Sequence, residues 1–253
     1  MKDWAFFFVL FKMFKSKESK KKSQFFDKYD EDGGSKRNLT SWNLKLVGGL
    51  AIFWSLFQLW YASPLPYLLD FGKFIDVPAR AIHLAFGMSL CFLAYPSFKS
   101  NRNKKISIID IIFVIISLIA TLYLYLDYEG LVNRQGILAN FKIFNFVIPY
   151  ELILGLFGII LLLEATRRAI GTPLVVIALI FILFSIFGQV MPHLISHQGL
   201  SFTRLVGYHW FGGEAIFGIP ISVSVSFIFL FVLFGSMLDA AGGGKYFLNL
   251  AFA

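Results

Sequence analysis

Histidine spacing gives the first chemical signal in this sequence. Two of its four histidines, His193 and His197, stand four residues apart, which would place both imidazoles on one helix face, as in many zinc sites. No acidic residue or cysteine completes a ligand set nearby, and Pro192 interrupts any local helix. The alternatives are a zinc site and an extracytoplasmic surface, and we expect the surface. His83 stands in an apolar segment, where we expect a packed or interfacial histidine rather than a proton relay.

Enzyme motifs are missing from the sequence. It contains no G-x-S-x-G elbow, no H-E-x-x-H pair and no Walker loop. Ser222, Ser224 and Ser226 have no evident histidine partner, and Gly242–Gly244 before Lys245 lack the upstream glycine and the following hydroxyl of a phosphate loop. We predict no catalytic residue, no metal and no cofactor, and keep an intramembrane enzyme as the less favoured alternative.

A few charged residues stand at the ends of apolar runs. Arg204, His209 and Glu214 precede the last long run and form a candidate docking surface for a soluble partner outside the membrane. Glu214 is also explained by the positive end of the following helix, and this is the explanation we favour. Glu164 and Arg168, four apart with the acid first, predict an ion pair at a helix end.

The last long apolar run would position several of these groups. Residues 216–238 carry no charge until Asp239, and as a helix they would cross about 30 Å of hydrocarbon. Gly218, Ser222 and Ser226 recur every four residues and predict a small-residue face for helix packing. The run ends before Gly242–Gly244, which cannot extend a helix cheaply.

Composition places the whole chain in a membrane. Of its 253 residues, 57% are hydrophobic and only 15% are charged, with a mean hydropathy of +0.71. The formal charge of +8 sits in the N-terminal tail and in alternate short loops, which indicates membrane topology rather than nucleic-acid binding. Cys91 is the single cysteine, so no disulfide framework exists within the chain.

These patterns predict an all-α, polytopic membrane protein with about six spans. A basic tail, residues 1–45, is too polar to fold alone and could lie on anionic lipid. Asp110 stands one turn inside the third run, close enough to reach the interface. The expected spans are 46–61, 78–98, 106–126, 149–163, 173–190 and 216–238.

Loop charges predict the orientation. The tail, the 99–105 loop and the Arg167–Arg168 turn are strongly basic, whereas the intervening loops mix fewer basic residues with acidic ones. The N-terminus is therefore expected in the cytoplasm, with 192–213 outside and 239–245 inside.

The C-terminal third resembles a transporter family. EAIFGIPISVS and FIFLFVLFGSMLDAAGGGKYFLNLA resemble the opening of the large, DctM-like membrane subunit of TRAP transporters, especially fused permeases of the TAXI type. EATRRAIGTPLVVIALIFILFSIFG is similar to the region that joins the small subunit to the large one in such permeases. The resemblance is specific from about Glu164 onward and implies a four-helix small-subunit-like domain, residues 46–170, fused to the start of the large subunit, residues 171–253.

The resemblance also implies a function. TRAP permeases are multi-pass proteins of the inner membrane that take up carboxylates from a periplasmic binding protein, here of the TAXI type, with sodium as the coupling ion. Because the chain stops as another apolar segment begins, we expect it to be truncated, with the remainder of the large subunit as a partner and the substrate residues beyond Ala253. The alternatives are a non-transporting scaffold or assembly protein and an inactive fragment. The positions that match the family pattern are expected to be of scaffold type: Glu214, Gly218, Pro220, Gly235, Gly242 and Gly244.

Overall fold

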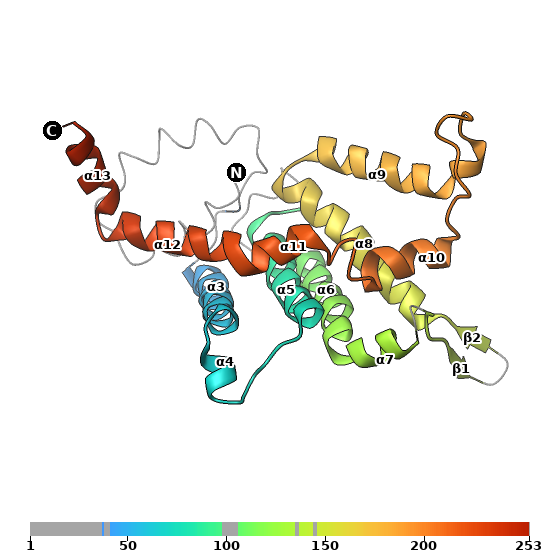
Figure 1. The fold of residues 1–253 in the computed structure, drawn as a ribbon, viewed down its shortest axis with the longest axis horizontal. Coiled ribbons are helices and arrows are strands. Elements are labelled where there is room, and N and C mark those ends of the chain that lie inside the picture. The colour runs from blue at the N-terminus through green and yellow to red at the C-terminus, as the bar shows by residue number, and fades with distance from the viewer. Residues whose placement is uncertain (1–36, 38–40, 98–105, 135–136, 144–145, 253) are drawn as a thin grey trace.

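The computed structural model describes residues 37, 41–97, 106–134, 137–143 and 146–252 (Figure 1). Its helices, in chain order, are α3 (Ser41–Ala62), α4 (Leu65–Leu68), α5 (Asp76–Ala94), α6 (Ile108–Leu126), α7 (Tyr128–Asn133), α8 (Tyr150–Ala169), α9 (Thr172–Ile186), α10 (Phe202–Val206), α11 (Ile219–Val223), α12 (Phe229–Ala240) and α13 (Gly243–Ala251). The shorter elements are the 3-10 helix η2 (Gly188–Val190), the π-helices η3 (Gly207–Phe211) and η4 (Ser224–Ile228), and the antiparallel strands β1 (Phe141–Ile143) and β2 (Phe146–Ile148).

Helix α5 is the centre of the fold. It packs against α3, α6 and α8, and 67% of its most apolar 18-residue stretch is buried. Ala79, Ala81 and Ala85 are all buried there, and such small side chains let neighbouring helices approach closely. The helix ends at Ala94 because Tyr95 precedes Pro96, and the residue before a proline avoids helical geometry.

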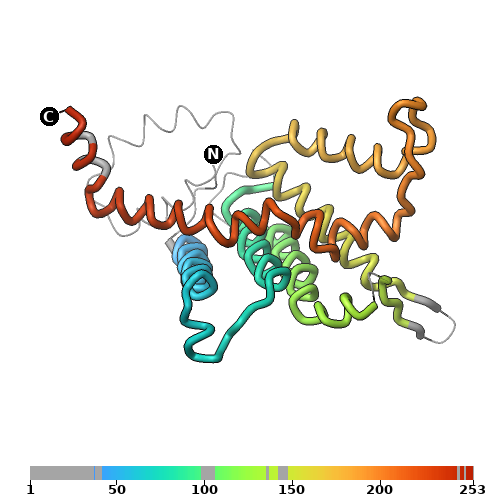
Figure 2. Tube along the Cα trace, viewed as in Figure 1, coloured from blue at the N-terminus to red at the C-terminus, as the bar shows by residue number. Residues whose placement is uncertain are grey.

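The α11–η4–α12 helix runs across the other helices. Figure 2 shows this last long helix passing over α5 and then over α3, and both contacts are close. Only 11% of the most apolar 18-residue stretch of this helix is buried. The helix contacts α5 through α11 and η4 and contacts α3 through α12, and Phe231 and Phe234 of α12 are exposed.

The predicted fold class is confirmed. The protein is an all-α membrane protein apart from the short β1–β2 hairpin, and a helix occupies each of the six predicted runs. Four described helices are long and apolar enough to cross a membrane: Trp42–Ala62, Asp76–Ala94, Ile108–Leu126 and Ile219–Ala240. The fifth run, α9, has 15 helical residues, and α8 is charged at both ends, so the number of spans stays a prediction.

The predicted tail lies mostly outside the described residues. Its described part is Arg37, which is 6% exposed, and residues 41–45, which already belong to α3. The backbone N–H of Arg37 donates to the carbonyl of Ala94 at 3.0 Å. This residue is therefore packed against the end of α5.

Candidate functional site

Polar side chains buried among the apolar helices join α3 and α5 to the crossing helix. Gln58 of α3 is fully buried, and its Nε2 donates to the backbone carbonyl of Val225 at 2.9 Å. His83 of α5 lies 3.2 Å through Nε2 from Ser224 Oγ, and Arg80 donates to the carbonyl of Phe217 at 2.8 Å. A polar group in hydrocarbon is costly without a partner, so these bonds hold the helices in one register.

The hydrogen bonds of His83 fix its chemistry. Trp54 Nε1 lies 3.2 Å from His83 Nδ1, and an indole nitrogen can only donate. Nδ1 therefore accepts, Nε2 carries the proton, and that proton is donated to Ser224 Oγ. Both ring nitrogens are engaged in hydrogen bonds to neighbouring side chains, and the residue is 8% exposed. His83 is thus a packed histidine, as expected, and it joins Trp54 of α3 to Ser224 of η4.

Ring packing closes this cluster around Phe229. The rings of Trp54 and Phe229 have centroids 4.8 Å apart, and those of His83 and Phe229 are 5.9 Å apart. Phe229 is 1% exposed and follows directly after η4. The Val225 carbonyl that accepts from Gln58 lies within η4, the π-helical segment just before Phe229.

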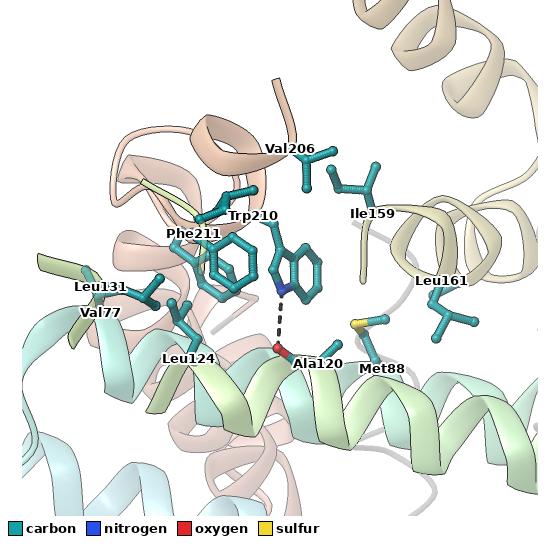
Figure 3. Close-up of a cluster of buried hydrophobic side chains, with 14 of the residues drawn as sticks. Val77, Met88, Ala120, Leu124, Leu131, Ile159, Leu161, Val206, Trp210 and Phe211 are labelled. Carbon is teal, nitrogen blue, oxygen red and sulfur yellow. Dashed lines mark hydrogen bonds between the residues drawn. The ribbon is translucent and has the colours of Figure 1, made fainter. Parts of the chain in front are cut away.

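A second contact, made by Trp210, joins the segment after α9 to the N-terminal helices. Trp210 lies in η3, is fully buried, and donates through Nε1 to the carbonyl of Ala120 in α6 at 3.2 Å (Figure 3). Gly155 and Gly158 of α8 make room for it, because a Cβ at either position would overlap Trp210 or its neighbours Val206 and Phe211. The glycines of α8 form a cradle that only this aromatic segment fills.

One ion-pair cluster lies where α6, α7 and α8 meet. Arg134 Nη2 lies 2.8 Å from Asp127 Oδ2 and 2.5 Å from Glu151 Oε1. Tyr123 donates to Glu151 at 2.5 Å, and the backbone N–H of Ala139 donates to the same fully buried carboxylate. The Arg134 guanidinium, donating to Asp127, holds the pKa of that carboxyl below its usual value.

A second cluster ties the other end of α6 to α8. Asp110 is fully buried and accepts from Arg168 at 2.8 Å and from Arg37. Arg168 also donates to Glu164 at 2.7 Å, which confirms the predicted pair at the end of α8. The Arg168 guanidinium lies over the rings of Phe92 and Phe113, 4.9 and 5.2 Å from their centroids. Asp110 is covered by α8 and Arg37, and its position relative to the membrane interface stays a prediction.

These buried polar groups position helices and present no free reactive pair. A comparison with known families bears on the function of the C-terminal part of the chain. Residues 157–253 match the family described as "Tripartite ATP-independent periplasmic transporter, DctM component". The match covers 97 of the 253 residues and supports a permease component of TRAP type. No curated protein and no solved structure matches the chain.

The residues that match the DctM component, which we call the DctM region, begin inside α8 and include one side of each contact described above. Trp210 and the η4 segment belong to the matched residues, whereas Ala120, His83 and Gln58 precede them. The DctM region is therefore packed onto the helices that precede it by specific contacts.

The residues of the predicted family pattern are spread along the DctM region. Gly218 is buried and stands as N-cap of α11, where a Cβ would overlap the Glu214 carbonyl, and Pro220 is exposed in the first turn. Gly235 is exposed in α12 with open space around it. Gly242 has a φ of +86° and ends α12, and Gly244 lies in α13. A larger residue would clash with the backbone at Gly218 and would be strained by the positive φ at Gly242.

The predicted packing face is arranged differently from the contact face. Ser222 and Ser226 are half-buried, and Ser226 donates to the Ser222 carbonyl at 2.7 Å within its own helix. The side chains buried against α3 and α5 are those of Val225 and Phe229. Val225 and Phe229 are also four residues apart, so this contact face lies beside the face of Gly218, Ser222 and Ser226, and packing through those three residues stays a prediction.

The predicted docking residues lie between the start of α10 and the start of α11. Arg204 and Glu214 are exposed, and His209 is half-buried with its Nδ1 2.9 Å from the Leu205 carbonyl. Among these three described residues no ion pair or hydrogen bond is formed. The docking surface stays a prediction.

The histidines of the loop after α9 have separate environments. His197 Nε2 lies 3.0 Å from the carbonyl of Phe184, and its Nδ1 accepts from the N–H of Gly199 at 3.1 Å. His193 is exposed. Within the described residues no group of three metal-ligating side chains forms. Both nitrogens of His197 serve the loop itself, which favours the surface alternative.

Sequence reasoning missed Gln58, Trp210, Gly155 and Gly158. Gln58 is the one amide inside its apolar run, and a polar side chain at membrane depth is a signal that could have found it. Gly155 and Gly158 stand three apart on α8, a small-residue spacing that indicates close packing. Their partner Trp210 had no such signal.

Proposed function

We propose that this chain is the permease component of a TRAP-type secondary transporter of the TAXI type, in the inner membrane with its N-terminus in the cytoplasm. A small-subunit-like domain would be fused to the start of the DctM-like subunit. Uptake of carboxylates delivered by a periplasmic binding protein would be driven by an ion gradient, with sodium as the coupling ion.

One observation carries this proposal. The segment that matches the DctM component is packed onto the N-terminal helices through Trp210 on Ala120 and Gln58 on Val225. A four-helix unit that holds the start of a transport subunit in this way has the role expected of the small subunit, which supports the mobile part within the bilayer.

The test is uptake by cells with and without this gene, in its natural reading frame and with the gene for its binding protein. Radiolabelled succinate, glutamate and 2-oxoglutarate serve as probes, in sodium buffer and in buffer with potassium replacing sodium. We expect faster uptake of at least one probe only when the gene and sodium are both present.

The alternatives predict different results. A non-transporting scaffold would leave uptake of every probe unchanged on deletion while an associated membrane protein loses its complex. Uptake that depends on the gene but not on sodium would overturn the coupling ion and keep the transporter.

A further inference from the structure

The connection between α3 and α5, residues 63–75, is unusually apolar for a surface loop, and we name it the α4 loop. Leu68 is 75% exposed and Phe71 is 73% exposed, and of the four residues of α4 only Pro66 is buried. The large apolar side chains that it exposes are Leu65, Tyr67, Leu68, Leu69, Phe71 and Ile75. Contiguous apolar surface of this kind marks an interaction site.

Hydrogen bonds to the end of α3 fix the shape of the α4 loop. Trp60 Nε1 donates to the carbonyl of Gly72 at 3.2 Å, and the N–H of Phe71 donates to the carbonyl of Pro66 at 3.2 Å. Gly72 has a φ of +64°, so the turn uses a conformation that glycine adopts without strain. The exposed side chains are therefore held outward by the fold.

The exposed surface continues that of a candidate span. Phe53, Leu56 and Leu59 of α3 are 63%, 59% and 46% exposed and lie on the helix that leads into the loop. Such side chains on a membrane helix face lipid. In Figure 1 the α4 loop projects beyond the ends of α3 and α5, away from α9 and α10. It therefore stands where a bilayer changes from acyl chains to headgroups.

Charge placement fits the same boundary. Lys73 Nζ lies 2.5 Å from Asp70 Oδ1 and 5.9 Å from the centre of the Tyr67 ring. Lysine and tyrosine at a membrane surface extend their polar ends to the headgroups while their apolar parts stay in lipid. A soluble protein partner would leave the adjoining lipid-facing surface of α3 unexplained.

We propose that the α4 loop is an interfacial anchor that inserts Leu68 and Phe71 into the lipid leaflet at which α3 ends and α5 begins. The partner is the boundary between headgroups and acyl chains. The anchor fixes the depth of these two helix ends, and it does not depend on the proposed transport function.

The test measures depth in vesicles of phosphatidylethanolamine and phosphatidylglycerol. The full chain carries Cys91→Ser and a single nitroxide at Leu68→Cys, Phe71→Cys or, as the matched control, Asp76→Cys, whose native side chain is 75% exposed at the start of α5. Collision rates with oxygen, which concentrates in lipid, and with a water-soluble nickel chelate are compared.

We expect labels at 68 and 71 to collide more with oxygen than with the nickel chelate, and the label at 76 to show the reverse. Preferential collision with nickel at 68 and 71 would place the loop in water and overturn the proposal. Protection from both reagents would show a protein partner and would overturn it equally. A loss of uptake plays no part in this measurement, so the two proposals fail separately.

Discussion

Replacing Gly158 by alanine tests the cradle that holds Trp210. A Cβ at this position would overlap three atoms of the indole ring, well inside the normal carbon contact distance of about 3.5–4.0 Å. The ring cannot move aside easily, because it is fully buried and its Nε1 is bound to the Ala120 carbonyl. Overpacking of this kind costs about 1–3 kcal/mol.

Alanine also favours the helix, so the two effects oppose each other. The gain in helix propensity is about 1 kcal/mol, which leaves a net loss of up to about 2 kcal/mol for Gly158→Ala. For a chain of this size a loss of about 2 kcal/mol lowers the melting midpoint by about 4–8 °C. The assay is thermal unfolding of the purified protein in detergent, followed by fluorescence and by loss of the monodisperse peak.

Gly87→Ala is the matched control. Gly87 lies in the central helix α5, but no atom stands within 4 Å of a Cβ built there, so its variant should melt at or slightly above the wild-type midpoint. In a Trp210→Phe background Gly158→Ala should cost less, since the smaller ring leaves room. Equal midpoints for the two alanine variants, or an equal cost in both backgrounds, would refute the cradle.

Three further substitutions probe the polar contacts, each read as a melting midpoint in detergent. Gln58→Leu should cost about 0.6–1.7 kcal/mol, because it removes a hydrogen bond between helices. Ser55→Ala should cost less, because the Ser55 hydroxyl bonds to the Ala51 carbonyl of its own helix at 2.9 Å. Equal effects of the two substitutions would count against the Gln58 contact. Asp110→Asn should cost about 3–5 kcal/mol, because its buried arginine partners keep their charge; an unchanged midpoint would contradict the buried network. Arg134 lowers the pKa of Asp127 in the folded state, so the stability that this carboxylate adds is present above its ordinary pKa of 3.8 and is lost as pH falls through the lower folded value. The difference in melting midpoint between wild type and Asp127→Asn should therefore shrink below about pH 4. A difference that stays constant with pH would exclude this linkage.

Helix positions could be predicted from the sequence because each apolar run is its own signal. Hydropathy placed α3, α5, α6 and the crossing helix within a few residues of their observed bounds. The pair of Glu164 and Arg168 could also be predicted, since i, i+4 neighbours meet on any helix. Local periodicity was sufficient for these features.

Contacts between helices could not be predicted in the same way. Gln58 and Val225 are 167 residues apart, and Trp210 and Ala120 are 90 apart. Apolar runs of similar composition do not specify which run packs on which, so these pairs leave no trace in one sequence. The small-residue spacing did not identify Val225 as a contact residue either, because Val225 stands outside the series Gly218, Ser222 and Ser226.

Two contacts fasten part of the region that matches the DctM component. Trp210 is bonded to α6 and Val225 to α3, so displacing residues 210–229 would break Trp210 from Ala120 and Val225 from Gln58 at once. After Phe229 the described hydrogen bonds of α12 and α13 run within this segment, as in Ser236 to the Val232 carbonyl. Segments with few buried contacts open at the lowest free energy. Within the last long helix we therefore expect motion to be less costly beyond Phe229 than before it, because moving η4 would break its bonds to Gln58 and His83.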